Sequence, residues 1–307
     1  MIPNLEHRLS PRSLRLIDAI AREGSLLRAG QSVGLTQSAV TKALQEIEAT
    51  CGVPLFDRTN RGVHPTAFGA VLIEHARLIL AQLRHAAQEL ADLQSGAGGR
   101  VAVGTLVSAA VSLLPRAIAQ VQASRPNLTV KIVEGTNDTL MPQLRSGDLD
   151  LVVGRLPDLN SGQGIAEERL CDDHAQIVAR KGHPLLSRPA LHLSDLLDWR
   201  WILPREETSL RRQIEEAFRA ENLPPPTYGV ESVSVLANRA LVLQTDYLAV
   251  WPVQLARAES DRGLVQILPV ALPTTARPIG ISTRRTGRLS PAAALLIAAL
   301  HTAAKTL

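Results

Sequence analysis

Apolar side chains recur at helical spacing in the first third of the chain and in short runs beyond residue 100. In the segment LTQSAVTKALQEIE (35–48), Val40, Leu44 and Ile47 are spaced by four and three, which predicts one buried helix face. The opposite face carries Gln37, Ser38, Thr41, Lys42 and Gln45. Such side chains form hydrogen bonds with little net charge, whereas a merely solvated face is usually richer in Glu and Lys pairs. The pattern therefore favours a helix that contacts base edges.

Three helices and a hairpin are expected in the first 66 residues. The helices cover 11–23, 26–32 and 37–50, and the strands of the hairpin cover 54–57 and 63–66. Gly24 and Gly34 end the first two helices, and Thr36 is the N-cap of the third. Two helices joined by a turn that contains glycine are typical of a helix-turn-helix. The hairpin forms a wing that carries Arg58 and Arg61.

A long helix follows, with one narrow apolar seam. Its members alternate in spacing between four and three: Leu72, Ala76, Ile79, Leu83, Ala86, Leu90 and Leu93. The seam could pack on the C-terminal part of the same chain, but the heptad pattern favours a coiled-coil homodimer. The segment SGAGGR (95–100) is expected to be a flexible linker.

Beyond residue 100, predicted strands alternate with predicted helices, which favours βαβ units and a mainly parallel sheet. The strands are expected at 100–106, 128–135, 149–154, 175–179, 201–203, 228–231, 247–251, 265–268 and 279–283. The helices are expected at 112–126, 138–147, 209–220, 233–244 and 291–304. A single sheet is possible, but the irregular segment PDLNSGQG (157–164) fits two lobes with a hinge better.

The expected fold class is thus α/β with an N-terminal α-rich winged helix-turn-helix, in three parts. These are a DNA-binding domain (1–66), a dimerising linker helix (67–95) and a two-lobed domain (96–307). Lobe 1 is expected at about 100–161 and 267–307, and lobe 2 at about 162–266.

Bulk charge adds little to this assignment. The net charge is +4, but residues 1–66 hold eight basic against six acidic residues, so the DNA assignment depends on the pattern. Cys51 and Cys171 form no disulfide framework, which fits a reducing cytoplasm. The N-terminus lacks the apolar core of a signal peptide, and the longest apolar run (292–300) is too short to span a bilayer, so no membrane association is expected.

The motif TQSAVT…EIE…GVPLFDR…RGV…T.FG, within residues 11–69, resembles the winged helix-turn-helix of the LysR-type transcriptional regulators. In the second half, SGDLDLVVGRL, VARKGHPLL and DYLAVWP resemble the family's effector-binding region, which has a fold like periplasmic binding proteins. The run VEGTNDTL, with WILPREETSLRRQIEEAF, looks most like the branch of galactose-binding-protein and protocatechuate-pathway regulators.

The resemblance implies DNA contacts from the polar face of helix 37–50. Gln37, Lys42 and Gln45 would face the major groove, and Ser38 and Thr41 are better placed for phosphates. At the wing, Arg61 would probe the minor groove, whereas Arg58 could contact phosphate or form a salt bridge with Asp57. The implied partners are double-stranded DNA, a second copy through the linker helix, a tetramer of such copies and RNA polymerase.

A ligand cleft is expected where strands end and helices begin, because ligands of open α/β sheets bind there. The candidate residues for an effector, an organic acid or a sugar, are Thr105, Val107, Ser108, Thr136, Asn137, Arg155, Arg205, Thr208 and Ser232. Thr136, Thr208 and Ser232 could equally be ordinary N-caps. Arg155 could instead pair with a carboxylate across the hinge.

Enzyme motifs are absent: the chain has no GxSxG, no P-loop and no HExxH. The run CDDH (171–174) has metal-ligating side chains, but four consecutive residues do not form one tetrahedral site, and Asp172 and Asp173 are expected in a loop. No cofactor and no metal are predicted. We therefore expect a transcriptional regulator that responds to a small molecule. The alternative is a cytoplasmic small-molecule-binding protein whose N-terminal helices serve assembly.

Overall fold

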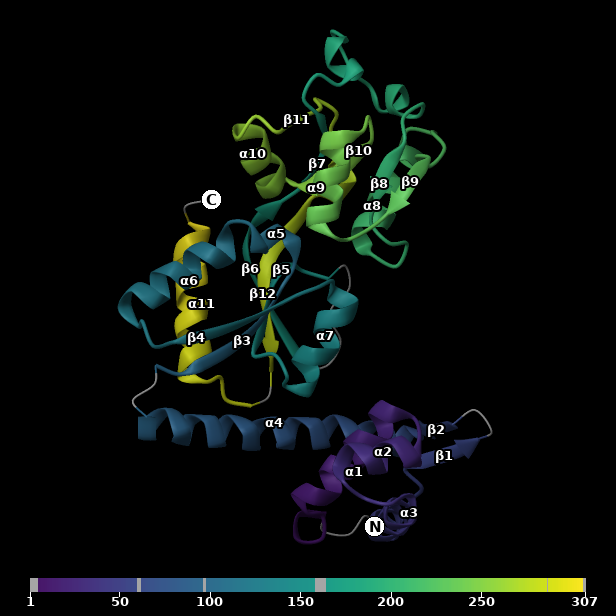
Figure 1. Cartoon of the computed structure of the whole chain (residues 1–307), viewed down its shortest axis with the longest axis vertical. Helices are drawn as coiled ribbons and strands as arrows, with labels where there is room; N and C mark the ends of the chain where they lie inside the picture. The colour runs from purple at the N-terminus through teal and green to yellow at the C-terminus, as the bar shows by residue number, and fades with distance from the viewer. Residues whose placement is uncertain (1–4, 60–61, 96–97, 158–163, 286, 306–307) are drawn as a thin grey trace. The chain divides into compact units, whose positions relative to one another are not determined.

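The computed structural model describes residues 5–59, 62–95, 98–157, 164–285 and 287–305 (Figure 1). The chain divides into two compact units, one made essentially of the residues up to the end of the long helix and the other of the residues that follow. In the first unit the elements are the 3₁₀ turn Leu5–His7, α1 (Pro11–Glu23), α2 (Leu26–Val33), α3 (Gln37–Cys51), β1 (Phe56–Thr59), β2 (Gly62–Pro65) and α4 (Ala67–Ser95). The three helices and the hairpin expected from the sequence are therefore present, with ends that differ by one or two residues.

Local capping explains where α3 begins, and a buried stripe explains how it packs. The Thr36 side chain accepts a hydrogen bond from the backbone N–H of Ala39 at 3.3 Å. Gly34, at φ 72°, ends α2 in the left-handed region that glycine adopts without strain. The predicted stripe Val40, Leu44 and Ile47 is buried in the core of the unit.

The hairpin is fixed to α3 by a carboxylate. Glu48 Oε1 accepts hydrogen bonds from the backbone N–H groups of Leu55 at 2.7 Å and Phe56 at 3.2 Å. Strands β1 and β2 are antiparallel, with Phe56 opposite Pro65. The wing therefore keeps a set position relative to the helix-turn-helix.

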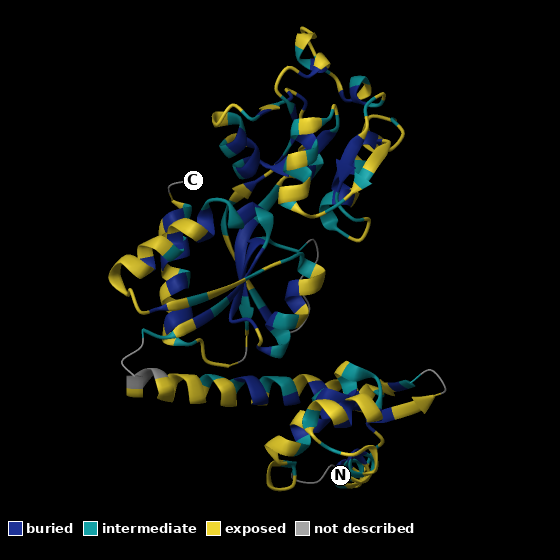
Figure 2. Ribbon diagram, viewed as in Figure 1, coloured by how far each residue is buried: buried dark blue, intermediate teal, exposed yellow. Residues whose placement is uncertain are grey.

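Helix α4 buries only one of its apolar faces within this unit. Ala76 and Leu80 pack on Leu14 of α1, and Arg77 Nε donates to Asp18 Oδ1 at 2.6 Å. Exposed positions recur along the same helix (Figure 2). They include the large apolar residues Phe68, Val71, Ile79, Leu83 and Leu90. Of the predicted seam, Ala76 is thus buried and Ile79, Leu83 and Leu90 are open, while the side chain of Leu93 lies outside the described ones.

The second unit contains two five-stranded sheets, which confirms the two-lobed arrangement. The first has the order β4-β3-β5-β12-β6. Its strands are β3 (Arg100–Thr105), β4 (Thr129–Glu134), β5 (Leu151–Arg155), β6 (Ile165–Asp173) and β12 (Arg277–Arg284), covered by α5 (Val107–Ala110), α6 (Leu113–Ser124), α7 (Asn137–Ser146) and α11 (Pro291–Ala304). Helices α6 and α11 pack side by side on one face, and α7 packs on the other.

The second sheet has the order β11-β7-β10-β8-β9. Its strands are β7 (Ala175–Arg180), β8 (Trp201–Leu203), β9 (Tyr228–Glu231), β10 (Leu248–Pro252) and β11 (Val265–Ile267). Its helices are α8 (Ser209–Ala220), α9 (Val235–Gln244) and α10 (Val253–Asp261), with 3₁₀ turns at Pro184–Ser187, Leu193–Leu196 and Pro273–Thr275. Strands β8, β9 and β10 are parallel to one another, as are β3, β4 and β5.

The chain crosses between the two sheets next to Thr275. The Thr275 hydroxyl is fully buried, accepts from the backbone N–H of Ala175 at 3.0 Å and donates to the carbonyl of Leu272 at 2.7 Å. Strand β6 pairs with β12 in the first sheet, so the sheets separate after Asp173 and not near residue 162 as expected. Asp172 and Asp173 end strand β6, so the prediction of a loop at these residues is wrong; polar residues on an edge strand have no apolar alternation to mark them.

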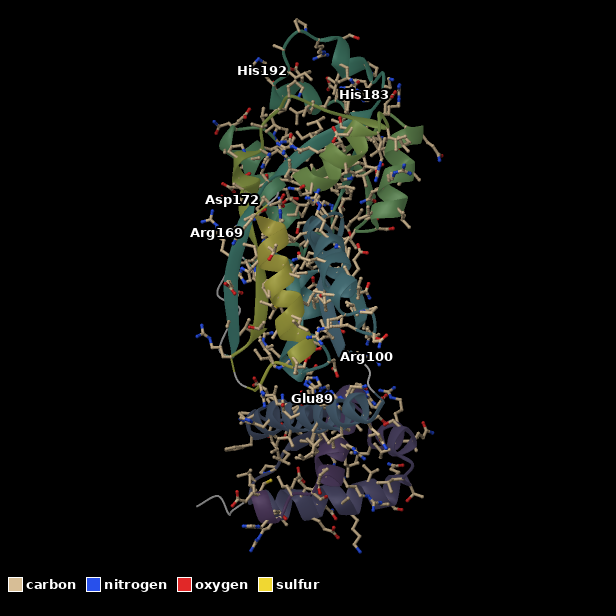
Figure 3. The ribbon with its side chains drawn as sticks, turned by 90° about the vertical axis from the view of Figure 1, so that its left-hand side faces the viewer. Glu89, Arg100, Arg169, Asp172, His183 and His192 are labelled. Carbon is tan, nitrogen blue, oxygen red and sulfur yellow. The ribbon has the colours of Figure 1, made fainter. Side chains whose placement is uncertain are left out.

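His183 is a buried histidine of the second lobe (Figure 3). Its Nδ1 accepts from the backbone N–H of Leu185 at 3.2 Å, so the neutral ring carries its proton on Nε2, which contacts the carbonyl of Asp246 at 3.2 Å. Burial lowers the pKa of His183 below its ordinary value. The contact with the Asp246 backbone and the Asp246 charge oppose this shift, and Arg180 adds to it.

We expect acid to destabilise the second lobe through His183. A lowered pKa means that the unfolded chain binds the proton more readily, so the free energy of unfolding falls as pH decreases through and below the ordinary histidine range, near 6.5. Urea midpoints at pH 7.5 and pH 5 should differ less in His183→Asn than in the unmodified chain. His192→Asn, at an exposed histidine of the same lobe, is the control and should leave the difference between the two urea midpoints as in the unmodified chain. If His183→Asn also leaves that difference unchanged, His183 is not the source of the acid sensitivity.

Candidate DNA interface and ligand cleft

The outer face of α3 presents the side chains that the sequence singles out. Gln37, Ser38, Lys42 and Gln45 are exposed, and Thr41 is half-buried. The hydroxyls of Thr36 and Ser38 lie 3.1 Å apart at the start of the helix. A helix with hydrogen-bonding side chains on its open face and a buried stripe behind can enter a major groove as a rigid body.

Among the described residues, the wing carries one arginine, Arg58. Arg58 on β1 is exposed, and it forms no ion pair with any residue that the structure describes, so the alternative pairing with Asp57 is not found. Arg61 lies outside the described residues. Arg58 is therefore available for a phosphate.

A cavity of about 870 Å³ lies between the two sheets of the second unit. It is lined by the segments that follow the carboxyl ends of all six parallel strands, the position at which open α/β sheets bind ligands. Eight predicted residues line it: Val107, Ser108, Thr136, Asn137, Arg155, Arg205, Thr208 and Ser232. The ninth, Thr105, does not: its side chain is buried in the first lobe and Oγ1 donates to the carbonyl of Leu106. Side chains alternate along a strand, so the last residue of β3 faces inward while the residues after it face the cavity.

Arg155 is the centre of the polar network on the first lobe. Its backbone N–H donates to Ser108 Oγ at 3.1 Å, and its carbonyl accepts from Asn137 Nδ2 at 3.2 Å. Its Nε donates to Asp173 Oδ2 at 2.5 Å, and the exposed side-chain fractions are 11% for Arg155 and 0% for Asp173. Arg155 thus pairs with a carboxylate of its own lobe, because β5 and β6 belong to the same sheet, and the expected alternative of a pair across the hinge is wrong. Arg155 still lines the cavity.

On the second lobe, two helix N-termini face the cavity. Thr208 caps α8, since its Oγ1 accepts from the backbone N–H of Arg211 at 3.3 Å. Ser234, not Ser232, caps α9, by accepting from the backbone N–H of Ala237 at 3.3 Å. Ser232 instead holds the turn before the helix, with Oγ accepting from the backbone N–H of Ser234 at 3.1 Å.

The lining residues that were not predicted include three with polar side-chain atoms that bear on recognition: Asp138, Asn238 and Trp251. Asp138 Oδ2 lies 3.5 Å from Nη2 of Arg205, so this ion pair bridges the two lobes. Trp251 is the penultimate residue of β10, which runs parallel to β8, and the rule about carboxyl ends of strands could have identified it from the motif DYLAVWP. Asn238 lies one turn into α9, where no sequence signal distinguishes it from a surface asparagine.

A buried carboxylate, that of Glu259, joins α9 and α10 in the second lobe. Glu259 of α10 accepts hydrogen bonds from Arg239 of α9 and from Arg262, the latter at 2.7 Å. Burial raises the pKa of Glu259, but the hydrogen bonds and charges of the two arginines outweigh it, and the pKa is lowered overall. The pair of guanidinium groups therefore keeps the carboxylate ionised.

The described residues contain no group of three or more His, Cys, Asp or Glu side chains that could hold a metal ion. In the run CDDH, Asp173 pairs with Arg155 and Asp172 with Arg169, so both carboxylates are engaged by arginines. No helix in the described parts of the chain is long and apolar enough to cross a membrane.

Two family models match the chain. The model described as the LysR substrate binding domain matches residues 94–305, and the model described as the bacterial regulatory helix-turn-helix protein, lysR family, matches residues 11–70.

Curated relatives cover nearly the whole chain. The HTH-type transcriptional regulator GbpR of Azospirillum brasilense is 38% identical over 309 residues, which cover 98% of this chain and 89% of GbpR. The HTH-type transcriptional regulator PcaQ of Agrobacterium fabrum is 33% identical over 303 residues, with coverage of 98% and 96%. The crystal structure of full-length CbnR complexed with its target DNA matches with a TM-score of 0.63 at 20% identity, covering 96% of this chain and 100% of CbnR, which supports the fold.

We expect the Arg155–Asp173 pair to matter far more for stability than the neighbouring surface pair. Arg155→Leu leaves the fully buried Asp173 without its partner, which should lower the free energy of unfolding by about 3–5 kcal/mol. The matched change Arg169→Leu breaks a pair whose side chains are 63% and 77% exposed, and should cost less than about 1 kcal/mol. Urea unfolding followed by circular dichroism measures both, and equal losses would contradict the ranking.

Proposed function

The chain belongs to the LysR family of bacterial transcriptional regulators, and on that premise we propose that α3 contacts DNA and that the inter-lobe cavity holds the effector. The family, its branch and the α/β fold class with an N-terminal helix-turn-helix agree with the expectations from the sequence. The family consists of regulators, so the chain is not an enzyme. The alternative of a binding protein with a mere assembly module is set aside, because residues 11–70 match a DNA-binding family.

The single observation that carries the DNA proposal is the open polar face of α3, positioned by a buried stripe on its other side. Gln37, Lys42 and Gln45 would reach base edges in the major groove. Ser38 and Thr41 would bind phosphates, as would Arg58 of the wing, and Arg61 would enter the minor groove.

The observation that carries the effector proposal is the cavity at the carboxyl ends of six parallel strands. Thr136 and Asn137 at α7 and Thr208 at α8 place helix N-termini against it, and these N-termini expose backbone N–H groups. A ligand that binds one arrangement of the lobes better than another would change the angle between them. We propose that this change alters the bend of the bound DNA.

We propose assembly through the exposed stripe of α4, first to a homodimer and then to a homotetramer. Ile79, Leu83 and Leu90 are exposed on one heptad seam, and apolar side chains at a and d positions are stabilised by a partner helix. A dimer also presents two reading helices to two half-sites. RNA polymerase is the proposed further partner, and the cytoplasm, where bacterial DNA lies, is the proposed location.

Gln37→Ala should abolish discrimination at one base pair of a preferred duplex, a loss of about 1–3 kcal/mol if Gln37 forms a bidentate contact with adenine. Duplexes selected from a random pool, followed by fluorescence anisotropy on every single-base variant, measure it. Gln31→Ala removes an exposed glutamine of α2 and serves as the control. Arg58→Ala should instead weaken the binding of all duplexes by a similar factor. It should also reduce the slope of the logarithm of the binding constant against the logarithm of the salt concentration by about 1. A wild-type base profile in Gln37→Ala would count against the assigned reading face.

Leu83→Glu combined with Leu90→Glu should raise the dimer dissociation constant at least tenfold, because four carboxylates would enter the seam of each dimer. Sedimentation equilibrium of the full chain measures the association. Gln88→Glu introduces the same charge at an exposed position of α4 off the seam and should leave the dimer intact. If the double variant and the control associate equally well, α4 does not form the dimer seam.

A further inference from the structure

The cavity contains guanidinium groups, but each already makes a contact with an oxygen atom of the protein. Its charged lining residues, among those described, are Glu134, Asp138, Glu207, Arg155, Arg205 and Arg212. Arg155 is paired with Asp173, Arg205 with Asp138, and Arg212 Nη1 donates to the carbonyl of Glu207 at 3.3 Å. With Asp173 included, four carboxylates face three guanidinium groups, so the wall has no surplus of positive charge for an anion.

Asp173 neutralises the charge of Arg155, the most buried of the three arginines. Its side chain is fully buried, and its distance to Arg155 is 2.5 Å. An anionic ligand that recruited Arg155 would leave Asp173 buried without its partner, or would lie beside a second negative charge in a poorly solvated site. Both outcomes oppose the binding of a carboxylate at this point.

The amide groups of the wall point to the complementary ligand chemistry. Asn137 Nδ2 donates to the carbonyl of Arg155 and Asn238 Nδ2 donates to the carbonyl of Ser232, which fixes the orientation of each amide. Each Oδ1 is consequently an acceptor, and both are buried without a hydrogen-bond partner among the described residues. An acceptor requires a ligand donor, which an ionised carboxylate does not have and a hydroxyl does.

Unpaired donors lie in the same wall. Nη1 and Nη2 of Arg155 and Nε1 of Trp251 are likewise buried without partners among the described side chains and backbone. A hydroxyl group can accept from such an N–H and donate to an amide oxygen at the same time, because it carries one proton and two lone pairs. Neighbouring hydroxyls on one small molecule fit this mixture of donors and acceptors.

We propose that Asp173 sets the charge preference of the cavity: by neutralising Arg155 it makes the site select a neutral ligand with several hydroxyl groups, a monosaccharide or polyol, over a carboxylate. The inference rests on the proposed function of the cavity as the effector site. Asp173 is a specificity-determining residue that acts through Arg155, since the cavity is lined by Arg155 and not by Asp173.

The test compares matched probes on the full-length chain by isothermal titration calorimetry. Each pair differs only in a CH₂OH group replaced by a carboxylate: glucose and glucuronate, galactose and galacturonate, with hexitols and aldonates as open-chain pairs. The unmodified chain should bind at least one neutral probe at least tenfold more tightly than its acidic partner.

Asp173→Asn keeps the size and one acceptor of the side chain while releasing the charge of Arg155, and should shift that ratio at least tenfold toward the acid. Asp172→Asn is the matched control, because Asp172 is the preceding residue of β6 and pairs at the surface with Arg169 (Figure 3). The control should leave the ratio unchanged. The double variant Arg155→Gln/Asp173→Asn removes both charges and leaves no buried ion unpaired. It therefore controls for a loss of folding in Asp173→Asn, and it should retain the preference for the neutral probe.

The inference is overturned if the unmodified chain prefers the acids, if no neutral probe binds, or if Asp173→Asn and the control give the same ratio. Failure of the proposed function gives a different result, measured on the DNA complex by gel mobility. A neutral probe that binds with the expected ratio but leaves the bend of the bound DNA unchanged upholds the charge preference and contradicts the effector role.

Discussion

The ion pair between Arg155 and Asp173 is the constraint on which the ligand-binding half of the molecule depends. Arg155 ends β5, where the cavity begins, and Asp173 ends β6, where the chain leaves the first sheet. Both side chains are almost wholly buried, so neither charge can be satisfied by water. One contact therefore joins a residue that lines the cavity to the last residue of the strand at which the chain leaves the first sheet.

The polar groups around that pair serve structure and recognition together. Ser108 and Asn137 hold the backbone of Arg155, and this leaves Asn137 Oδ1 as an acceptor in the wall. On the other lobe, Thr208 and Ser234 satisfy the first N–H groups of α8 and α9 while their helix ends face the same cavity. A group that is half satisfied by the fold is positioned to complete its hydrogen bonds with a ligand, at little cost in ordering.

The helix-turn-helix unit follows a different principle, since the face of α3 that we propose for DNA makes few contacts within the protein. Val40, Leu44 and Ile47 fix the helix, and Glu48 fixes the wing to it. The side chains on the outer face of α3 are therefore not needed for packing, and they can be suited to contacts with DNA. Helix α4 combines both principles, with Ala76 and Leu80 buried on α1 and Leu83 and Leu90 exposed.

Elements with strong apolar periodicity could be predicted from the residues alone. Helices α3, α8 and α11 were predicted within a residue, because apolar spacing, N-caps and glycines are local signals. Of the nine residues predicted for the cleft, eight line the cavity, because the ends of parallel strands can be located from the alternation of strands and helices. Only the tertiary structure placed β6 in the first sheet, turned Thr105 away from the cavity and joined Asp173 to Arg155. Strand pairing, the inward or outward direction of a side chain and the partner of a buried charge depend on residues far apart in the chain, which no local pattern records.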